Sequence, residues 1–259
     1  MKKSHLLLVI TILTYIFLVG PMLIMVGTSF SSTAAVSFPP TGFSLQWYEK
    51  AFTLPSFQRG FVTSLTVSLI GTLTAMLLGI PAAYAINKYR FKGKALINGF
   101  FLSPTLIPAL VLGFALLRTF IPRIGGSVYI GLAVGYTLIA LPYIIRTTGS
   151  AMSNFDFSIE EAARSLGTSA IPAFFLTVIP NIRSGLISAF ILAFINSFND
   201  VSIGVFISSP GTMTLPTAMQ SIIIGRMDPT IAAASVLLML MTILLMTLSE
   251  KILGIRLKR

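Results

Sequence analysis

The sequence predicts an all-α membrane protein with six transmembrane helices and both termini in the cytoplasm. Three observations lead there: 55% of the 259 residues are hydrophobic, only 10% are charged, and long apolar runs alternate with short basic segments. Soluble domains carry about 25% charged residues, and a water-soluble core could not bury this much apolar surface. Cysteine is absent, which excludes disulfides and thiolate-bound metal. The single histidine, His5, lies near the N-terminus and is not expected to bind metal.

Six apolar runs are long enough to cross the roughly 30 Å of hydrocarbon, which takes about 17–25 helical residues. They cover, with approximate edges, residues 6–30, 61–87, 98–120, 128–148, 185–207 and 231–253. The first run is longer than the apolar region of a signal peptide, so we expect a retained span, kinked at Pro21. Residues 1–259 are thus expected to form a single membrane domain.

The basic residues divide unevenly between the two sets of connecting segments. Only five of the 18 lie in one set: Lys50, Arg59, Arg118, Arg123 and Arg226. Because short cytoplasmic loops carry the excess of lysine and arginine, the richer set and both termini are placed inside. Membrane topology then accounts for the net charge of +11, and no nucleic-acid partner is expected. The inner loop KYRFKGK could bind anionic lipid.

Small residues and prolines mark two of the spans. In the second span, small residues recur every four positions and predict a face that packs closely on another helix: Gly71, Ala75, Gly79 and Ala83. The third span contains SPTLIP, where Pro104 and Pro108 interrupt the hydrogen-bond ladder and nearby hydroxyls can compensate. That feature indicates either a kink in a pathway or a packing bend. Outside the spans, LQWYEKAF predicts a short interfacial helix with Trp47 and Tyr48 at headgroup depth.

The largest inner loop, residues 149–184, contains the polar stretch SIEEAARSLGTS. Ser158 and Glu161 have the spacing of a capping box, which predicts that a helix starts at Ser158. Gly167 suits the left-handed position that ends a helix, and a second helix is expected from Thr168 or Ser169. This second helix is too short to span a membrane. We expect a helix–turn–helix that lies against the membrane domain and either enters a groove of a partner protein or is a capped loop without a partner.

A polar face is predicted in the fifth span. Asn196, Asn199 and Asp200 are spaced i, i+3 and i+4, so they would share one side of a continuous helix. Such a side is costly in lipid and should face protein or a water-filled cavity. It indicates a pathway lining, a satisfied hydrogen-bond cluster, or an aspartate paired with an arginine of a partner chain.

The stretch EEAARSLGTSAIPAFFLTVIP resembles the EAA signature of ABC importer permease subunits, with mild departures at Thr177 and Ile179. The residues that match are Glu161, Ala162, Ala163, Gly167 and Pro180. The resemblance implies the type I ABC importer permease fold. It also implies that Glu161, Ala162, Ala163 and Gly167 belong to a coupling helix that docks in a cleft of a separate ATPase. The chain lacks a GxxxxGK[ST] phosphate loop, so ATP is expected to be used by partner subunits, with no cofactor bound directly and no enzymatic activity of its own.

The same resemblance implies the partners and, more loosely, the solute. Expected partners are two ATP-binding cassette ATPases, a second and different permease, an external solute-binding protein and the lipid of a bacterial inner membrane. The runs SFND and YRFKGK resemble permeases of the spermidine/putrescine type. Two positions where that pattern often has acids hold Thr105 and Asn199, so thiamine, opine, phosphonate or iron importers stay open. A stand-alone secondary transporter is a further alternative, with Asp200 as its one intramembrane acid.

Overall fold

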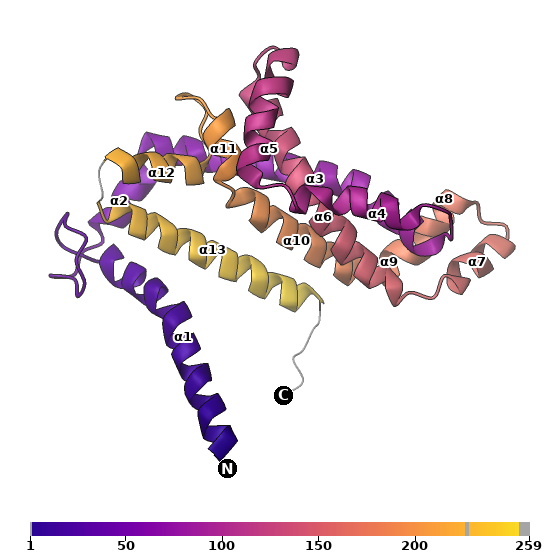
Figure 1. The fold of residues 1–259 in the computed structure, drawn as a ribbon, viewed down its shortest axis with the longest axis horizontal. Helices are drawn as coiled ribbons and strands as arrows, with labels where there is room; N and C mark the ends of the chain where they lie inside the picture. Colours follow the sequence, from indigo (N-terminus) through magenta and orange to yellow (C-terminus); the bar gives the residue numbers. More distant parts are fainter. Residues whose placement is uncertain (1, 226–227, 254–259) are drawn as a thin grey trace. The chain divides into compact units, whose positions relative to one another are not determined.

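The computed structural model describes residues 2–225 and 228–253, which fold almost entirely into helices (Figure 1). In chain order the α-helices are α1 (Lys2–Ser29), α2 (Gln46–Thr53), α3 (Pro55–Lys88), α4 (Lys94–Leu102), α5 (Ala109–Ala115), α6 (Val128–Ser153), α7 (Ser158–Ser165), α8 (Ala170–Ala173), α9 (Ile179–Asn181), α10 (Arg183–Phe198), α11 (Ser202–Ile207), α12 (Leu215–Gly225) and α13 (Thr230–Leu253). The described residues contain no strand, and one isolated bridge joins Ser209 and Thr212. The predicted all-α class is confirmed. Arg226 and residues 254–259 lie outside the described part of the chain.

Four helical segments are long and apolar enough to cross a membrane, and two bent pairs would raise the number to six. The four are His5–Ser29, Pro55–Lys88, Val128–Ser153 and Thr230–Leu248. One pair joins Lys94–Thr105 to Ala109–Arg123 with a bend of 90°, and the other joins Ala170–Asn181 to Arg183–Phe198 with a bend of 77°. The six predicted spans are therefore compatible with the structure over its described residues, but two of them are not straight helices.

The predicted third span, residues 98–120, is not one continuous helix. The helix starts earlier, at Lys94, and the chain turns sharply between α4 and α5. Pro108 stands at the break and cannot donate a backbone hydrogen bond. The hydroxyls of Ser103 and Thr105 donate to the carbonyls of Phe100 and Leu102, each at 2.7 Å. The Phe100 carbonyl also accepts the Ser103 N–H. The hydroxyls therefore add to the backbone bonding where the helix is interrupted, as the sequence suggested.

The predicted fifth span, residues 185–207, also breaks. Helix α10 ends at Phe198, and the separate helix α11 begins at Ser202. Asn199 is the residue that terminates α10, with its N–H bonded to the carbonyls of Ile195 and Ser197. The one-helix assumption behind the shared polar face was therefore wrong.

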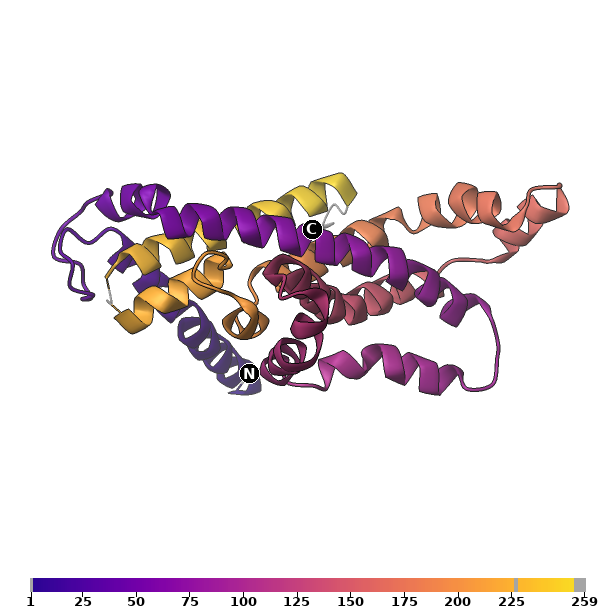
Figure 2. The ribbon, with the colours of Figure 1, turned by 90° about the horizontal axis from the view of Figure 1, so that it is seen from above.

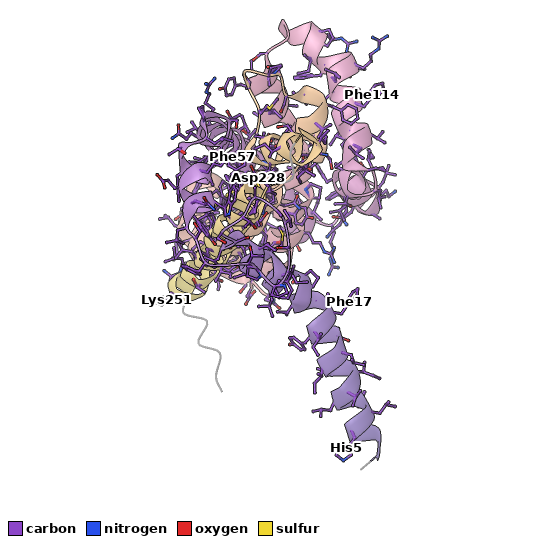
Figure 3. The ribbon with its side chains drawn as sticks, turned by 90° about the vertical axis from the view of Figure 1, so that its left-hand side faces the viewer. His5, Phe17, Phe57, Phe114, Asp228 and Lys251 are labelled. Atoms are coloured by element: carbon purple, nitrogen blue, oxygen red, sulfur yellow. The ribbon has the colours of Figure 1, made fainter. Side chains whose placement is uncertain are left out.

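The chain divides into two compact units, one of Met1–Arg59 with Ala218–Leu244 and one of Gly60–Thr217 with Leu245–Arg259. In the first unit, residues 5–19 of α1 are all exposed, and Phe17, labelled in Figure 3, is 78% exposed. An apolar helix this exposed is expected to face lipid or another chain.

Helix α2 belongs to the first unit and is held by hydrogen bonds from its aromatic residues. The Trp47 indole is buried and donates to the Ser31 carbonyl at 2.7 Å, and the Tyr48 hydroxyl bonds the Ser29 hydroxyl. Trp47 therefore anchors α2 to the chain after α1. The predicted short helix is confirmed, and the headgroup depth of Trp47 and Tyr48 stays a prediction. Lys50 and Asp228 form an ion pair at 2.5 Å in the same unit. Burial favours a higher pKa for Asp228, but the hydrogen bonds and charge of Lys50 and the bonds from Thr230 outweigh it, and the pKa is lowered.

The core of the second unit forms where α3 and α10 pack on α6. Ala75 and Ala83 of α3 are fully buried, together with Tyr136 and Ile144 of α6. A Cβ added at Gly71 would lie 2.8 Å from the Tyr136 Cβ and 3.1 Å from the Ala133 carbonyl oxygen. The small-residue stripe is thus confirmed as a packing face, because only small side chains allow the two backbones to approach this closely.

Gly71→Leu should destabilise the protein by about 1–3 kcal/mol, since the new side chain would have to displace Tyr136 and the backbone of α6. The measurement is unfolding of the detergent-solubilised chain. Gly99→Leu on α4 is the matched control, because a Cβ there meets nothing within 4 Å. If the two variants were equally stable, close packing of α3 on α6 would not limit stability.

Candidate functional site

The predicted coupling loop, residues 149–184, contains α7, a turn at Gly167 and α8 at one end of the second unit. This helix–turn–helix is called the elbow below. Helix α7 is followed by a sharp turn and by α8, which continues through a π-helical turn at Phe174–Val178 into α9. Figure 2 shows α7 and α8 together at the far end of this unit. Val178 and Ile182 below the elbow are buried in a cluster with Ala83, Ile145 and Met152. The second short helix therefore lies against the membrane helices, as predicted.

The start of α7 is capped by Asp156 and not by the predicted capping box. Ser158 is already the first helical residue, and its N–H donates to Asp156 Oδ1 at 2.9 Å. The N–H of Glu161, which the capping box would assign to Ser158, donates to the Phe157 carbonyl. The predicted helix start was right, whereas the predicted cap was wrong. The hydrogen bonds from the backbone and side chain of Ser158 lower the pKa of Asp156.

The end of α7 is set by Gly167, which has φ +97°. Its N–H donates to the Arg164 carbonyl at 3.0 Å, and the Thr168 N–H donates to the Ala163 carbonyl at 3.2 Å. This pair of bonds is a Schellman motif, which requires a left-handed residue and favours glycine. The predicted conformation of Gly167 is confirmed, and it reverses the chain into α8.

The two adjacent glutamates of α7 face opposite ways. Glu161 is exposed, whereas Glu160 is fully buried. Successive residues on an α-helix are about 100° apart, so both cannot occupy one face. Glu160 Oε1 accepts hydrogen bonds from the Tyr84 hydroxyl and the Lys88 ammonium, both at 2.6 Å. The sequence-based prediction missed Glu160. Helical geometry allows one glutamate to be buried while the other is exposed, but it does not require this.

The residues assigned to coupling lie together on the outer side of the elbow. Glu161, Ala162 and Gly167 are exposed and Ala163 is half-buried. An open hollow of about 630 Å³ lies beside them, lined by Glu161, Arg164, Ser165, Thr168, Ser169 and Ala170. Both signs of charge and several hydroxyls face this hollow, which suits a polar contact with another protein.

The three residues assigned to a pathway lie at one end of α10, in three different settings. Asn196, in the last turn of α10, is exposed and its amide donates to the Tyr143 hydroxyl of α6 at 3.3 Å. Asn199 is exposed beyond the helix end. Asp200 is half-buried, and its Oδ1 accepts the Ile203 N–H at 2.8 Å, which caps α11. The aspartate therefore has a local structural role, and this role leaves a pathway role untested.

Among the described residues, no group of three or more histidine, cysteine or acidic side chains is placed to hold a metal ion. The elbow and the polar end of α10 are thus the two places that carry the residues predicted to act in coupling and in a pathway.

The family described as "Binding-protein-dependent transport system inner membrane component" matches residues 75–258. The chain therefore belongs to this family of membrane permeases, which are transport subunits and not enzymes.

Two relatives in this family are similar to the chain over most of its length. The chain is 32% identical to the putrescine transport system permease protein PotI of Escherichia coli strain K12, over 90% of this chain and 85% of that protein. It is 27% identical to the spermidine/putrescine transport system permease protein PotC of Haemophilus influenzae, over 92% of each.

The fold is that of type I ABC importer permeases. A chain of a bacterial alginate ABC transporter, solved with its alginate pentasaccharide-bound periplasmic protein, matches with a TM-score of 0.74 at 16% identity, over 97% of this chain and 95% of that one. The MetNI methionine ABC transporter, in an inward-facing conformation, matches with a TM-score of 0.62 at 18% identity, over 76% and 94%. At these identities the likeness concerns the fold alone.

Asp156→Ala should loosen the first turn of α7, because it removes the acceptor of the Ser158 N–H. Hydrogen exchange of the peptide containing residues 158–161 should quicken, whereas Ser158→Ala should change it little, since the backbone donor remains. The folded pKa of Asp156 lies below its unfolded value, so its contribution is present above the unfolded pKa and is lost as pH falls through the lowered one. Equal exchange in both variants would contradict this capping scheme.

Proposed function

We propose that this chain is the permease subunit of an ATP-driven importer that carries polyamines such as spermidine or putrescine. In this proposal residues 1–259 act as one permease domain, and α7 docks into a cleft of a separate ATP-binding cassette subunit. The observation that carries it is the elbow itself. The polar outer side of α7, with Glu161 and Arg164, is exposed, while its inner side is joined to α3 through Glu160.

The proposed complex contains two ATPase subunits, a second permease of different sequence and an external solute-binding protein. The family's description as a binding-protein-dependent system supports the external partner. The distribution of lysine and arginine supports cytoplasmic termini in a bacterial inner membrane. The elbow would then lie on the cytoplasmic side, where ATP is available.

The proposed solute follows from the names of the relatives and from one carboxylate. PotI and PotC are named for putrescine and spermidine/putrescine transport. A polycation is attracted to carboxylates, and Asp200 lies at the polar break between α10 and α11. Asn196 and Asn199 beside it supply further polar groups. Since Thr105 and Asn199 replace acids often found in polyamine permeases, the uptake panel should also include thiamine, an opine, an aminophosphonate and ferric iron.

Glu161→Lys should weaken ATPase docking by reversing a charge on the outer side of the elbow. Affinity purification of the permease should recover at least about tenfold less ATPase, and polyamine uptake by a strain lacking the wild-type chain should not be restored. Glu49→Lys, the same change at another exposed glutamate, is the matched control and should retain both.

Two results would argue against the proposal. If no ATPase co-purified with the wild-type chain, a stand-alone transporter would explain the fold better than an importer subunit. If ATPase co-purified but deletion of the chain impaired uptake of another solute in the panel, the coupling would stand and the polyamine assignment would fall.

The variant Asp200→Asn should distinguish the role of this aspartate in capping α11 from its proposed role in attracting the solute. Asparagine caps a helix about as well as aspartate, so α11 should stay folded. The lost charge should raise the KM for polyamine uptake roughly tenfold or more, because charged hydrogen bonds contribute about 1.5–3 kcal/mol. Asp200→Ala should in addition lower the amount of folded protein. Wild-type kinetics in the asparagine variant would leave Asp200 with the capping role alone.

A further inference from the structure

Glu160 is a buried charge that docking of the outer side of α7 does not use. Its Oε1 accepts from the Tyr84 hydroxyl and from the Lys88 ammonium, and the ammonium also donates to the Tyr84 oxygen at 2.7 Å. The three side chains thus close a triangle of hydrogen bonds. Two of its corners belong to the last turns of α3, and the third belongs to the first turn of α7.

Aromatic rings flank this triangle, and its two charged side chains are buried. The side chain of Lys88 is 8% exposed and that of Glu160 is fully buried. The ammonium lies 5.1 Å from the ring centre of Tyr84 and 5.7 Å from that of Tyr89. Phe157 and Phe174 meet the Tyr84 ring edge-on, at 6.0 Å and 4.8 Å between centroids.

Burial makes the Lys88–Glu160 ion pair energetically costly to separate. Separating Lys88 from Glu160 would leave two charges in apolar surroundings with no water to replace the lost partner. The second oxygen of Glu160, Oε2, is buried without a hydrogen-bond partner, so the carboxylate depends on Oε1 for its contacts. The end of α3 and the start of α7 are therefore held at a fixed separation by a contact that resists stretching.

The two helices joined here differ in kind. Helix α3 is 34 residues long and passes the length and composition test for a membrane span. Helix α7 is short and presents Glu161 and Arg164 outward. We propose that the Glu160–Lys88–Tyr84 triangle is the joint through which a displacement of α7 is passed to the membrane helix α3. This inference rests on the proposed docking of α7 to an ATPase, and it makes Glu160 a positioning residue, separate in role from its neighbour Glu161.

The test uses the purified complex of permease and ATPase, reconstituted in vesicles with its binding protein. Three variants remove the charges: Glu160→Gln, Lys88→Met and the double variant. Glu49→Gln, the same change at an exposed glutamate of α2, is the matched control. Lys92→Met, at an exposed lysine of the neighbouring loop, controls for loss of a basic residue. ATPase co-purification, ATP hydrolysis and solute transported per ATP are measured for each.

If the triangle is the proposed joint, its loss should uncouple ATP hydrolysis from transport without preventing assembly of the permease with the ATPase. In Glu160→Gln and Lys88→Met, ATPase should co-purify as in the wild type and hydrolysis should continue, while transport per ATP falls at least about fivefold. The double variant should be no worse than the poorer single variant, because both changes open the same contact. It also removes both buried charges together, so it should fold even if a single variant with one orphaned charge does not.

Two outcomes would contradict the proposal that the triangle is a joint. The first is wild-type transport per ATP in the double variant. The second is a loss of folded permease with unchanged transport per ATP in the complexes that remain, which is the behaviour of a merely structural anchor. Failure of the wild-type chain to retain any ATPase would instead overturn the proposed function, and the joint with it, so the two failures are distinguishable.

A distance measurement on the permease alone adds a readout that does not need the ATPase. Spin labels at Arg90 and Ser165, both exposed, would report the separation between the loop after α3 and the end of α7. The wild-type chain should give one narrow distribution and Tyr84→Phe a moderately broader one, since the tyrosine hydroxyl is only one corner of the triangle. The double variant should give the broadest. Equal widths in all three would show that the triangle does not hold α7, and would overturn the proposal.

Discussion

The constraint on which the structure depends is that a chain crossing hydrocarbon must satisfy its own backbone hydrogen bonds. A long helix without internal proline, such as α13, meets this requirement along its length. Each break in a helix needs a local substitute. After α4, the hydroxyls of Ser103 and Thr105 donate to the carbonyls of Phe100 and Leu102, close to Pro104 and Pro108. Between α10 and α11, the carboxylate of Asp200 accepts a free N–H. Polar side chains thus lie at both of these breaks, while others, such as Ser64, Ser68 and Thr72, are buried within α3.

A small number of charged side chains also determines how the elbow is held. The sequence has only seven acidic residues, and three of them, Asp156, Glu160 and Glu161, lie in or just before α7. Asp156 caps the helix, Glu160 is buried against α3, and Glu161 faces outward. A short helix with these three fixed points has a defined start, a defined inner contact and a free outer side. In the proposed function, such a helix would meet the ATPase in one orientation.

Family membership gives these features a common setting. A permease has to bind a partner that hydrolyses ATP and has to move helices in the membrane, so it needs both an exposed docking element and a rigid connection to a span. In the proposed function, the exposed side of α7 and the triangle at the end of α3 would meet these two needs with adjacent residues of one helix. The close α3–α6 contact at Gly71 and Gly79 then ties α3 to the rest of its unit.

The sequence by itself determined the helical class, the approximate spans, the packing face of α3, the bounds of α7 and the turn at Gly167. These features follow from local composition, periodicity and the conformational freedom of glycine, which act over a few residues. It could not determine that Trp47 is buried, that Asp156 caps α7, or that α10 ends before Asn199, because neighbouring donors and acceptors compete and only the folded chain selects among them. Above all, Glu160 meets Lys88 across 72 residues of sequence. Helical geometry makes the two glutamates point in different directions. Which of them is buried, and what it contacts, is decided by how α7 packs on α3, and this is a property of the tertiary structure alone.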